Sequence, residues 1–287
     1  MGSNRRKNGR GFTLIELLVV ISIIALLLAI LIPSLSKAKD HAKKVMCSTD
    51  LRSLSLAARM YANEHDGFTP SSTNYWDSGS RAGWCGKTGT NQEAYDEDVQ
   101  IYGTADNPSF GLHNGQLWNY IETIEGWRCP ADPVKEQLRS YCMAAQWWGQ
   151  HYRENLNSIH YDGGRPKVFK KITAIPNASS RFLFVDQLGF NSDAYAALLY
   201  SSPSWWNIPN FLHSGGSVNG YADGHVEAYK FTKATVNLAN KSLEKSLKKQ
   251  NPGFMMDNSP AVKGNPNLEK DLRYYQRATW GDVGWTP

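Results

Sequence analysis

Motifs of several common enzyme classes are absent from this sequence of 287 residues. There is no nucleophile elbow and no dinucleotide-binding fingerprint. The glycine-rich stretch at 79–89 lacks the Gly-Lys-Ser/Thr that completes a phosphate-binding loop. The H-E-x-x-H pattern of zinc peptidases is missing too. We therefore expect a protein that is not an enzyme.

An excess of positive charge is missing from most of the chain. The formal net charge is +5, but residues 1–10 hold four basic residues and no acidic one. From Pro33 onward the chain has 27 basic and 25 acidic residues. A nearly neutral body lacks the electrostatic footprint that binds a phosphate backbone. We therefore expect no nucleic-acid partner.

Long apolar runs are rare, with one exception at the amino terminus. A hydrophobic content of 41% supports a folded core, and a mean hydropathy of −0.48 excludes a protein with many membrane spans. Residues 12–32 form an apolar run whose only charge is Glu16. As a helix this run is about 32 Å long, which matches a bilayer core. We predict a transmembrane helix over 12–32. A removable signal peptide, with Ser34 or Ser36 at its cleavage site, and an ordinary anchor are the alternatives.

Glu16 separates these alternatives, because a carboxylate within a membrane is costly and a plain anchor would carry Leu there. The cost for an acid at mid-membrane is on the order of 2.5–3.5 kcal/mol, and it is smaller one turn inside. Cleavage between Gly11 and Phe12 would create an α-amino group four residues before Glu16. That amino group could pair with Glu16 of a neighbouring copy, which predicts assembly through this helix.

The segment Arg10-Gly11-Phe12-Thr13-Leu14-Ile15-Glu16, with a basic leader before it and the apolar run after it, resembles the prepilin signature of type IV pilins and type II secretion pseudopilins. The resemblance implies that a prepilin peptidase cuts after Gly11 and methylates Phe12. It implies a helix kink at Pro33. It also implies a single-pass protein of the bacterial inner membrane, whose head is periplasmic or lies on a cell-surface filament.

The helical pattern continues beyond the membrane segment to His65. Apolar and small residues recur at spacings of three and four along a row that includes Leu35, Val45, Leu56 and Met60. A neighbouring row, Leu51, Leu54, Ala58 and Tyr61, widens this face. Asp66-Gly67 ends the helix. An apolar helix face needs a covering layer, so we expect an α+β fold in which the long helix packs on a small antiparallel sheet within a loop-rich head.

We divide the chain into five parts: a leader over 1–11, a transmembrane helix over 12–32, the outer half of that helix over 33–66, a pilin-like head over 67–231 and a carboxyl-terminal extension over 232–287. Within them we predict a long loop region at 66–116, a short helix at 117–125, a buried strand from Phe182 to Val185 that ends at Asp186, and a charged helix at 233–250. The tail at 251–287 either loops back over the body or stays loose. Asp223-Gly224 predicts a hairpin with a type I′ turn, between strands at 218–222 and 225–229.

Several blocks of the head resemble one branch of the pilin-like families, common in bacteria of the planctomycete and lentisphaera type. These blocks are YANEHDGFTP at 61–70, RCPAD at 128–132, Ser140-Tyr141, and His213 followed after nine residues by Asp223-Gly224. His213, Asp223, His225 and Glu227 also invite a metal or acid–base interpretation. A turn at Asp223-Gly224 and a hydrogen bond from His213 explain them more simply, so we expect no metal there.

Calcium is a further candidate ligand, because some major pseudopilins of the resembling family bind it near the carboxyl end. Here it would involve Asp186 or Asp193, and we otherwise expect no cofactor. Ten tryptophans, all between Trp76 and Trp285, could stack on sugars, but we expect them to fill the core and interfaces.

Four cysteines outside the cytoplasm favour two disulfides, for which three pairings exist, and reduced thiols are the alternative. Resembling proteins often carry one cysteine on the outer helix and one in the Cys-Pro block. This implies Cys47–Cys129 and leaves Cys85–Cys142.

The combined features predict a structural subunit of a type IV pilus or a type II secretion pseudopilus. Its expected partners are the prepilin peptidase, other pilin or pseudopilin subunits and the inner membrane. The alternative is a membrane-tethered periplasmic module that binds glycan or metal, or an enzyme, that uses the pilin-type helix only for export. The sequence leaves open whether the subunit is major or minor and which of the two assemblies it serves.

Overall fold

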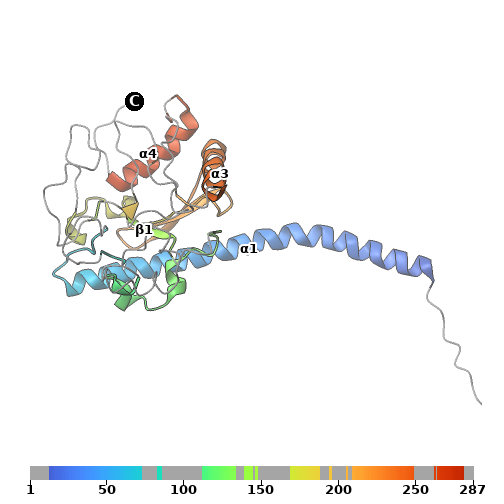
Figure 1. Cartoon of the computed structure of the whole chain (residues 1–287), viewed down its shortest axis with the longest axis horizontal. Helices are drawn as coiled ribbons and strands as arrows, with labels where there is room; N and C mark the ends of the chain where they lie inside the picture. The colour runs from blue at the N-terminus through green and yellow to red at the C-terminus, as the bar shows by residue number, and fades with distance from the viewer. Residues whose placement is uncertain are drawn as a thin grey trace, which may run out of the picture. The chain divides into compact units, whose positions relative to one another are not determined.

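The computed structural model describes residues 13–72, 83–85, 112–133, 139–144, 146–147, 169–187, 194–195, 205, 209–248, 262 and 264–280 (Figure 1). The chain divides into two compact units, Met1–Ala42 and Lys43–Pro287. The division falls within the first helix, α1 (Leu14–Glu64). The predicted leader and most of the predicted loop region at 66–116 lie outside the described residues.

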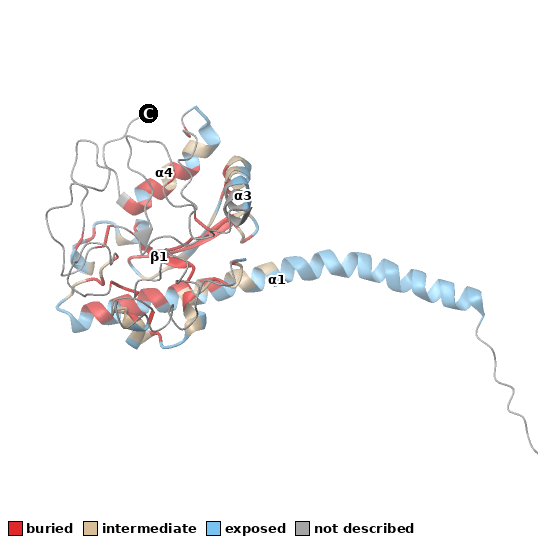
Figure 2. Cartoon of the chain, viewed as in Figure 1, coloured by how far each residue is buried: buried red, intermediate tan, exposed pale blue. Residues whose placement is uncertain are grey.

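The described part of the first unit is the amino-terminal stretch of α1. Its side chains from Leu14 to Ile32 are all exposed, as the pale blue of the helix shows (Figure 2). Among the described residues, α1 is the one helix long and apolar enough to cross a membrane. Pro33 lies inside α1, and the helix continues through it.

Within the second unit, one face of α1 forms part of the core. The buried residues of this face are Cys47, Leu51, Leu54, Ser55, Ala57, Ala58, Tyr61 and Ala62. The prediction was right for the row that contains Leu51 and Tyr61, but wrong for the row that contains Leu56 and Met60. Those two side chains are 58% and 44% exposed. The buried face carries small residues, which allow close packing, and this decided which row faces the sheet.

The end of α1 lies where the sequence predicts it. Asp66 and Gly67 both adopt left-handed conformations, with φ of 53° and 81°, and the Gly67 amide donates to the Ala62 carbonyl at 2.7 Å. This bond satisfies a carbonyl that the helix itself leaves unpaired. The helix therefore ends at Glu64.

Five strands form one sheet in the order β3-β1-β2-β4-β5. Their bounds are β1 Tyr141–Ala144, β2 Phe182–Asp186, β3 Ala194–Tyr195, β4 Gly216–Tyr221 and β5 Val226–Lys230. All neighbours pair in antiparallel fashion except the short β3, which lies parallel to β1. The predicted α+β class is confirmed. The predicted buried strand is β2, which is buried along its whole length and lies at the centre of the sheet.

The β4–β5 hairpin is present, but its turn is not of type I′. That turn needs a positive φ at both central residues, and here Gly224 is left-handed (φ 94°) whereas Asp223 is not. The Gly224 amide donates to the Tyr221 carbonyl, and the Tyr221 amide donates to the His225 carbonyl, each at 2.9 Å. This is a three-residue loop that closes on a left-handed glycine, a common alternative for the same dipeptide.

Helices complete the head. The predicted helix at 117–125 is instead two 3₁₀ turns, η3 (Trp118–Tyr120) and η4 (Ile124–Trp127). Three more short turns are η2 (Leu112–Asn114), η5 (Ile172–Ala174) and η6 (Ala178–Ser180). The charged helix predicted at 233–250 is α3 (Lys233–Lys248).

Of the two alternatives for the tail, a return over the body is the correct one, because α4 (Pro266–Trp280) folds onto the sheet. Asn265 accepts the amides of Asn267 and Leu268 with its side-chain oxygen, and Pro266 occupies the first helical position. The inner face of α4 is buried (Figure 2), with Leu272, Tyr275 and Ala278 in the core. The extension is therefore part of the head's hydrophobic core.

Candidate functional sites

The start of α1 is a reciprocal cap formed by Thr13 and Glu16. The Glu16 carboxylate accepts both the backbone amide and the hydroxyl of Thr13 at 2.8 Å, and the Thr13 hydroxyl oxygen accepts the Glu16 amide at 3.2 Å. This is the capping-box arrangement, which satisfies two amides that the first helical turn leaves unpaired. Gly11 and Phe12 lie outside the described residues, so cleavage after Gly11 and methylation of Phe12 stay predictions.

A second site is a buried group of four side chains, which we call the Cys–His–Asp cluster: Cys47, Cys129, Asp186 and His213. One ligand atom from each lies within 4.8 Å of the other three. Nε2 of His213 is 3.0 Å from Asp186 Oδ2 and 3.2 Å from the Cys129 sulfur. His213 is 5% exposed and the other three are fully buried.

The cluster is assembled from four separate parts of the fold. Cys47 projects from the buried face of α1, and Cys129 begins the Cys-Pro turn after η4. Asp186 is the last residue of β2, and His213 lies in the turn before β4. No short sequence spacing links them, so the sequence alone contains no motif for this site.

Electrostatic effects within the cluster are strong because water is excluded. Burial lowers the pKa of His213. The hydrogen bonds and charge interactions that His213 makes with Asp186 and with the Cys47 sulfur outweigh burial and raise this pKa to about 9. Burial raises the pKa of Cys129 well above its usual range, and the Cys47 sulfur and the Asp186 charge add to this. For Cys47, burial acts upward, but hydrogen bonds from Cys129 and His213 dominate and lower its pKa.

Two further polar residues interact with the cluster: Asn210 through hydrogen bonds, and Asp50 through the charge of Asp186. The Asn210 side-chain amide donates to Asp186 Oδ1 and Oδ2 at 3.1 and 3.0 Å and lies 3.5 Å from the Cys129 sulfur. The Tyr141 hydroxyl donates to Asp50 at 3.0 Å. Burial raises the pKa of Asp50 to about 6 and the Asp186 charge acts in the same direction, against the Tyr141 hydrogen bond.

The structure changes the interpretation of the cysteines. It carries all four as buried thiols, so neither predicted disulfide, Cys47–Cys129 or Cys85–Cys142, is formed in it. Cys47 and Cys129 do come together, but His213 and Asp186 share the same space. Cys142 instead lies 3.8 Å from an Arg139 guanidinium nitrogen. A count of cysteines cannot reveal such neighbours, because they come from other elements.

The residues of the His213-x9-Asp-Gly pattern separate in space. His213 is buried in the cluster, whereas Asp223 and His225 form an exposed pair at 2.6 Å beside the hairpin turn. Arg59 on α1 donates to the Asp223 carbonyl at 2.6 Å. The turn therefore holds the hairpin to α1. Of the calcium candidates, Asp193 lies outside the described residues, and Asp186 faces sulfur and nitrogen atoms as well as Asn210.

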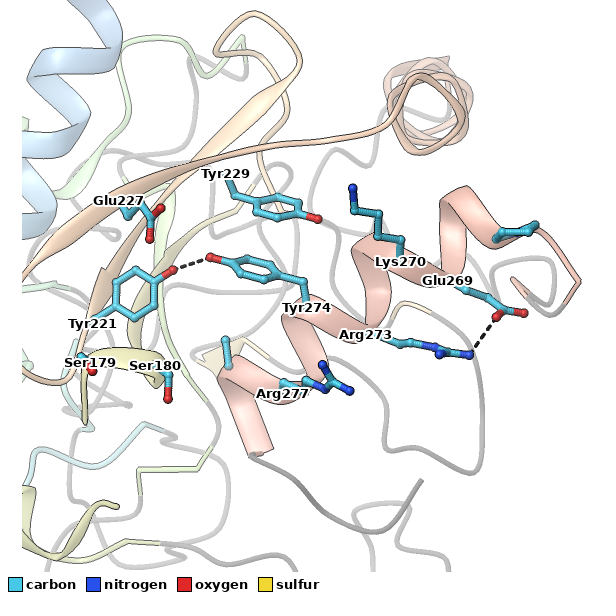
Figure 3. Close-up of a pocket in the computed structure, with 12 residues that line it drawn as sticks. Ser179, Ser180, Tyr221, Glu227, Tyr229, Glu269, Lys270, Arg273, Tyr274 and Arg277 are labelled. Carbon is cyan, nitrogen blue, oxygen red and sulfur yellow. Dashed lines mark hydrogen bonds and ion pairs between the residues drawn. The ribbon is translucent and has the colours of Figure 1, made fainter. Parts of the chain in front are cut away.

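A hollow of about 740 Å³ lies between α4, the β4–β5 hairpin and η6 (Figure 3). Tyrosine side chains line one part of it, and the hydroxyls of Tyr221 and Tyr274 are hydrogen-bonded to each other. Charged side chains of α4 line another part, including the Glu269–Arg273 ion pair at 3.0 Å and Arg277. Sequence analysis missed this hollow because it missed α4.

Most described tryptophans fill the core, as predicted. Trp84, Trp127 and Trp147 are fully buried, and Trp205 is 2% exposed. Trp84 stacks on Trp127 with ring centroids 5.7 Å apart, and the Arg139 guanidinium lies over the Trp84 ring. These rings therefore stabilise the head and do not form a sugar-stacking surface.

Comparison with known proteins places the amino-terminal segment in a class. Residues 6–32 match the family model of the prokaryotic N-terminal methylation motif. The chain is 41% identical over 63 residues to the type IV wide pilus major component PilA4 of Thermus thermophilus. The matched stretch covers 22% of this chain and 48% of the relative. No solved structure matches the chain.

Two further relatives match a stretch of similar length. The ComG operon protein 3 homolog of Bacillus licheniformis is 40% identical over 63 residues, 22% of this chain and 65% of the relative. The type II secretion system core protein G of Klebsiella michiganensis is 40% identical over 57 residues, 20% of this chain and 40% of the relative. The match thus spans between about two fifths and two thirds of these relatives. The chain is pilin-like, with a methylation motif at its amino terminus.

Proposed function

We propose that this chain is a structural, non-catalytic subunit of a type IV pilus or a type II secretion pseudopilus, assembled through α1. The observation that carries the proposal is the methylation motif at 6–32, followed by a helix whose apolar side chains are all exposed from Leu14 to Ile32. An apolar surface of this length requires a membrane or other subunits to cover it.

Processing is the first step of the proposal. A prepilin peptidase cuts between Gly11 and Phe12, removes the basic leader and methylates the new amino terminus. The chain stays in the inner membrane as a single-pass protein, with its head in the periplasm or, after polymerisation, on a filament. This orientation follows from the resemblance to pilins, in which the basic leader lies in the cytoplasm.

Assembly is the second step, and Glu16 is its central residue. The amino group of Phe12 in one subunit pairs with the Glu16 carboxylate of a neighbour, so that two charges in an apolar environment obtain partners. Glu16 already accepts two bonds from Thr13. The carboxylate is therefore held in one position before a neighbour arrives.

The head offers a continuation of the same contact surface. Four apolar side chains of α1 are between 44% and 58% exposed here: Val45, Met46, Leu56 and Met60. Val45, Leu56 and Met60 belong to the row that the sheet leaves uncovered, and Met46 follows Val45 in the sequence. We infer that the α1 helices of neighbouring subunits pack on this row.

Native protein and a Glu16→Ala variant test the proposal. Intact mass should begin at Phe12 with one added methyl group in both proteins, whereas filaments should form only with Glu16 present. Glu64→Ala is the matched control, since Glu64 ends the same helix and bonds Tyr120 instead. An uncut leader, or normal filaments from Glu16→Ala, would refute the proposal. Imaging of filaments that carry a carboxyl-terminal tag distinguishes a pilus from a secretion pseudopilus.

A second candidate is a membrane-tethered glycan-binding module, favoured by the hollow beside α4. Its tyrosines and charged groups are of the kinds that contact sugars (Figure 3). Binding of the full chain in detergent to a glycan array, lost in Tyr274→Ala, would support this candidate. Glycan binding by a protein that forms no filaments would favour it over assembly.

A further inference from the structure

The Cys–His–Asp cluster has the composition and the shape of a metal site. Its four side chains come from α1, the Cys-Pro turn, β2 and the turn before β4, and their ligand atoms converge within 4.8 Å. We propose that the cluster binds one zinc ion, with all four side chains as ligands. This proposal is independent of assembly through Glu16.

Two of the separations between ligand atoms come close to those of tetrahedral coordination. Zinc binds sulfur at about 2.3 Å and imidazole nitrogen or carboxylate oxygen at about 2.0–2.2 Å, so the ligand atoms of a tetrahedral site are about 3.3–3.8 Å apart. The observed His213–Asp186 and Cys129–His213 separations are 3.0 and 3.2 Å. Outward shifts of a few tenths of an ångström therefore make room for the ion.

The donor set selects the metal. Two thiolates and an imidazole suit zinc and other borderline metals, whereas calcium and magnesium take oxygen ligands. Asp186 is the one oxygen ligand of the cluster. Four protein ligands close the coordination sphere and leave no position for a substrate, which makes the site structural.

Hydrogen bonding alone accounts poorly for the cluster. Nε2 of His213 carries at most one hydrogen, yet it lies within hydrogen-bonding distance of both the Asp186 oxygen and the Cys129 sulfur. All of these groups are buried, where an unmatched polar atom is costly. Zinc binding would release the protons of the Cys47 and Cys129 thiols and of His213 Nε2 to solvent, so that one lone pair of each ligand atom bonds the ion and the competition for hydrogens ends.

A second layer of donors holds the ligands in place. Fully buried Asn210 donates to both oxygens of Asp186 and contacts the Cys129 sulfur. The Ala131 backbone amide also hydrogen-bonds the Cys129 sulfur. Donors of this kind orient metal ligands and offset thiolate charge, and their loss typically weakens metal binding about 10- to 100-fold.

The bound ion would link the outer half of α1 to the sheet. Cys47 belongs to the helix, and the other three ligands belong to the body of the head. Zinc binding would therefore contribute directly to the folding free energy of the head, since the unfolded chain does not hold four ligands together.

Metal content of the full-length protein tests the proposal. The chain is purified in detergent without chelator and with a tag that binds no metal. We expect elemental mass spectrometry to find about one zinc ion per chain. Cobalt added to the chelator-treated protein should give the charge-transfer absorption of thiolate ligands, and chelator should lower the thermal unfolding temperature.

Matched variants locate the site. His213→Gln and Asp186→Asn should lose the bound zinc, whereas His225→Gln and Asp223→Asn, which alter the exposed pair of the hairpin turn, should keep it. Asn210→Ala should bind zinc about 10- to 100-fold more weakly. Should the ligand variants fail to fold, the cobalt spectrum of the unaltered protein still decides the question.

Two results would overturn the proposal. One is a Cys47–Cys129 disulfide in protein isolated from the cell envelope, detected by peptide mass analysis, with no zinc bound. The other is zinc that binds equally to His213→Gln and His225→Gln, which would indicate adventitious binding. Either result would leave assembly through Glu16 intact.

Discussion

Thr13 and Glu16 cap the first turn of α1 for each other, through two hydrogen bonds to the Glu16 carboxylate and one to the Thr13 hydroxyl oxygen. The carboxylate that the sequence assigns to assembly thus has an intramolecular role before any neighbour is present. The two roles are compatible because a carboxylate can accept more than two hydrogen bonds.

Replacement of Thr13 by Val should loosen the start of α1 without a change of charge. Loss of a cap costs about 1 kcal/mol, so the first-turn amides should exchange about fivefold faster in detergent micelles, measured by hydrogen exchange. Ser22→Ala is the control, because the Ser22 hydroxyl bonds the Leu18 carbonyl within the helix and caps nothing. Equal exchange in Thr13→Val and the native protein would show that the cap contributes nothing.

Close packing of α1 on β4 depends on Gly220. A Cβ there would lie 2.9 Å from the Ser55 hydroxyl oxygen, so Gly220→Ala should lower the free energy of unfolding by about 1–3 kcal/mol. Ser55→Ala in the same chain should restore most of this loss, because the next atom is 3.6 Å away. Urea unfolding of both single variants and the double variant measures the coupling, and additive losses would contradict it.

Gly216→Ala provides the contrasting case. Its Cβ would lie 2.5 Å from the Tyr229 carbonyl oxygen, which is backbone of the paired strand. We expect a larger loss of stability than for Gly220→Ala, and no rescue by side-chain substitution. Rescue by truncation of a neighbouring side chain would show that the strand pair can shift.

Asp50 should make the stability of the head depend on pH. Its pKa is raised by burial to about 6, above the value of about 3.9 in an unfolded chain. Between these values the folded state binds more protons, so the free energy of unfolding should fall as pH rises from about 4 to about 6. Asp50→Asn should flatten this decline in urea unfolding at several pH values.

Tyr141→Phe tests the same relationship in the opposite direction. Removal of its hydrogen bond to the carboxylate should raise the pKa of Asp50 further and extend the decline to higher pH. Identical pH profiles for the native protein and Asp50→Asn would exclude Asp50 as the titrating group.

Asp271 attaches α4 to the start of α3. Its fully buried carboxylate accepts hydrogen bonds from Tyr229, from the amide and hydroxyl of Thr232 and from Thr235. Asp271→Ala should lower the free energy of unfolding by about 3 kcal/mol, because these donors lose their acceptor. Glu269→Ala on the same helix removes a partly exposed ion pair with Arg273 and an exposed hydrogen bond from the Gly264 amide, and it should cost about 1 kcal/mol or less. Equal losses in the two variants would show that the carboxylate does not anchor α4.

Helices and strands with a clear local signal could be predicted from the sequence. The apolar run and its continuation predict α1, the buried run Phe182–Val185 predicts β2, and Asp66-Gly67 marks the helix end. By contrast, α4 was missed because its flanking residues are rich in Pro, Gly and Asn. Its start signal, Asn265-Pro266, was present, but the composition of the whole tail outweighed it.

The sequence by itself determined the amino-terminal motif: basic residues, an apolar helix and a single acid at a fixed offset, all within one short segment. Only the tertiary structure decided which row of α1 is buried, because two apolar rows compete and close contact with Gly220 selects between them. It also decided the Cys–His–Asp cluster, since Cys47 and His213 are 166 positions apart in the sequence. Local patterns reveal what neighbouring residues do together, whereas a site built from distant elements exists only once the chain has folded.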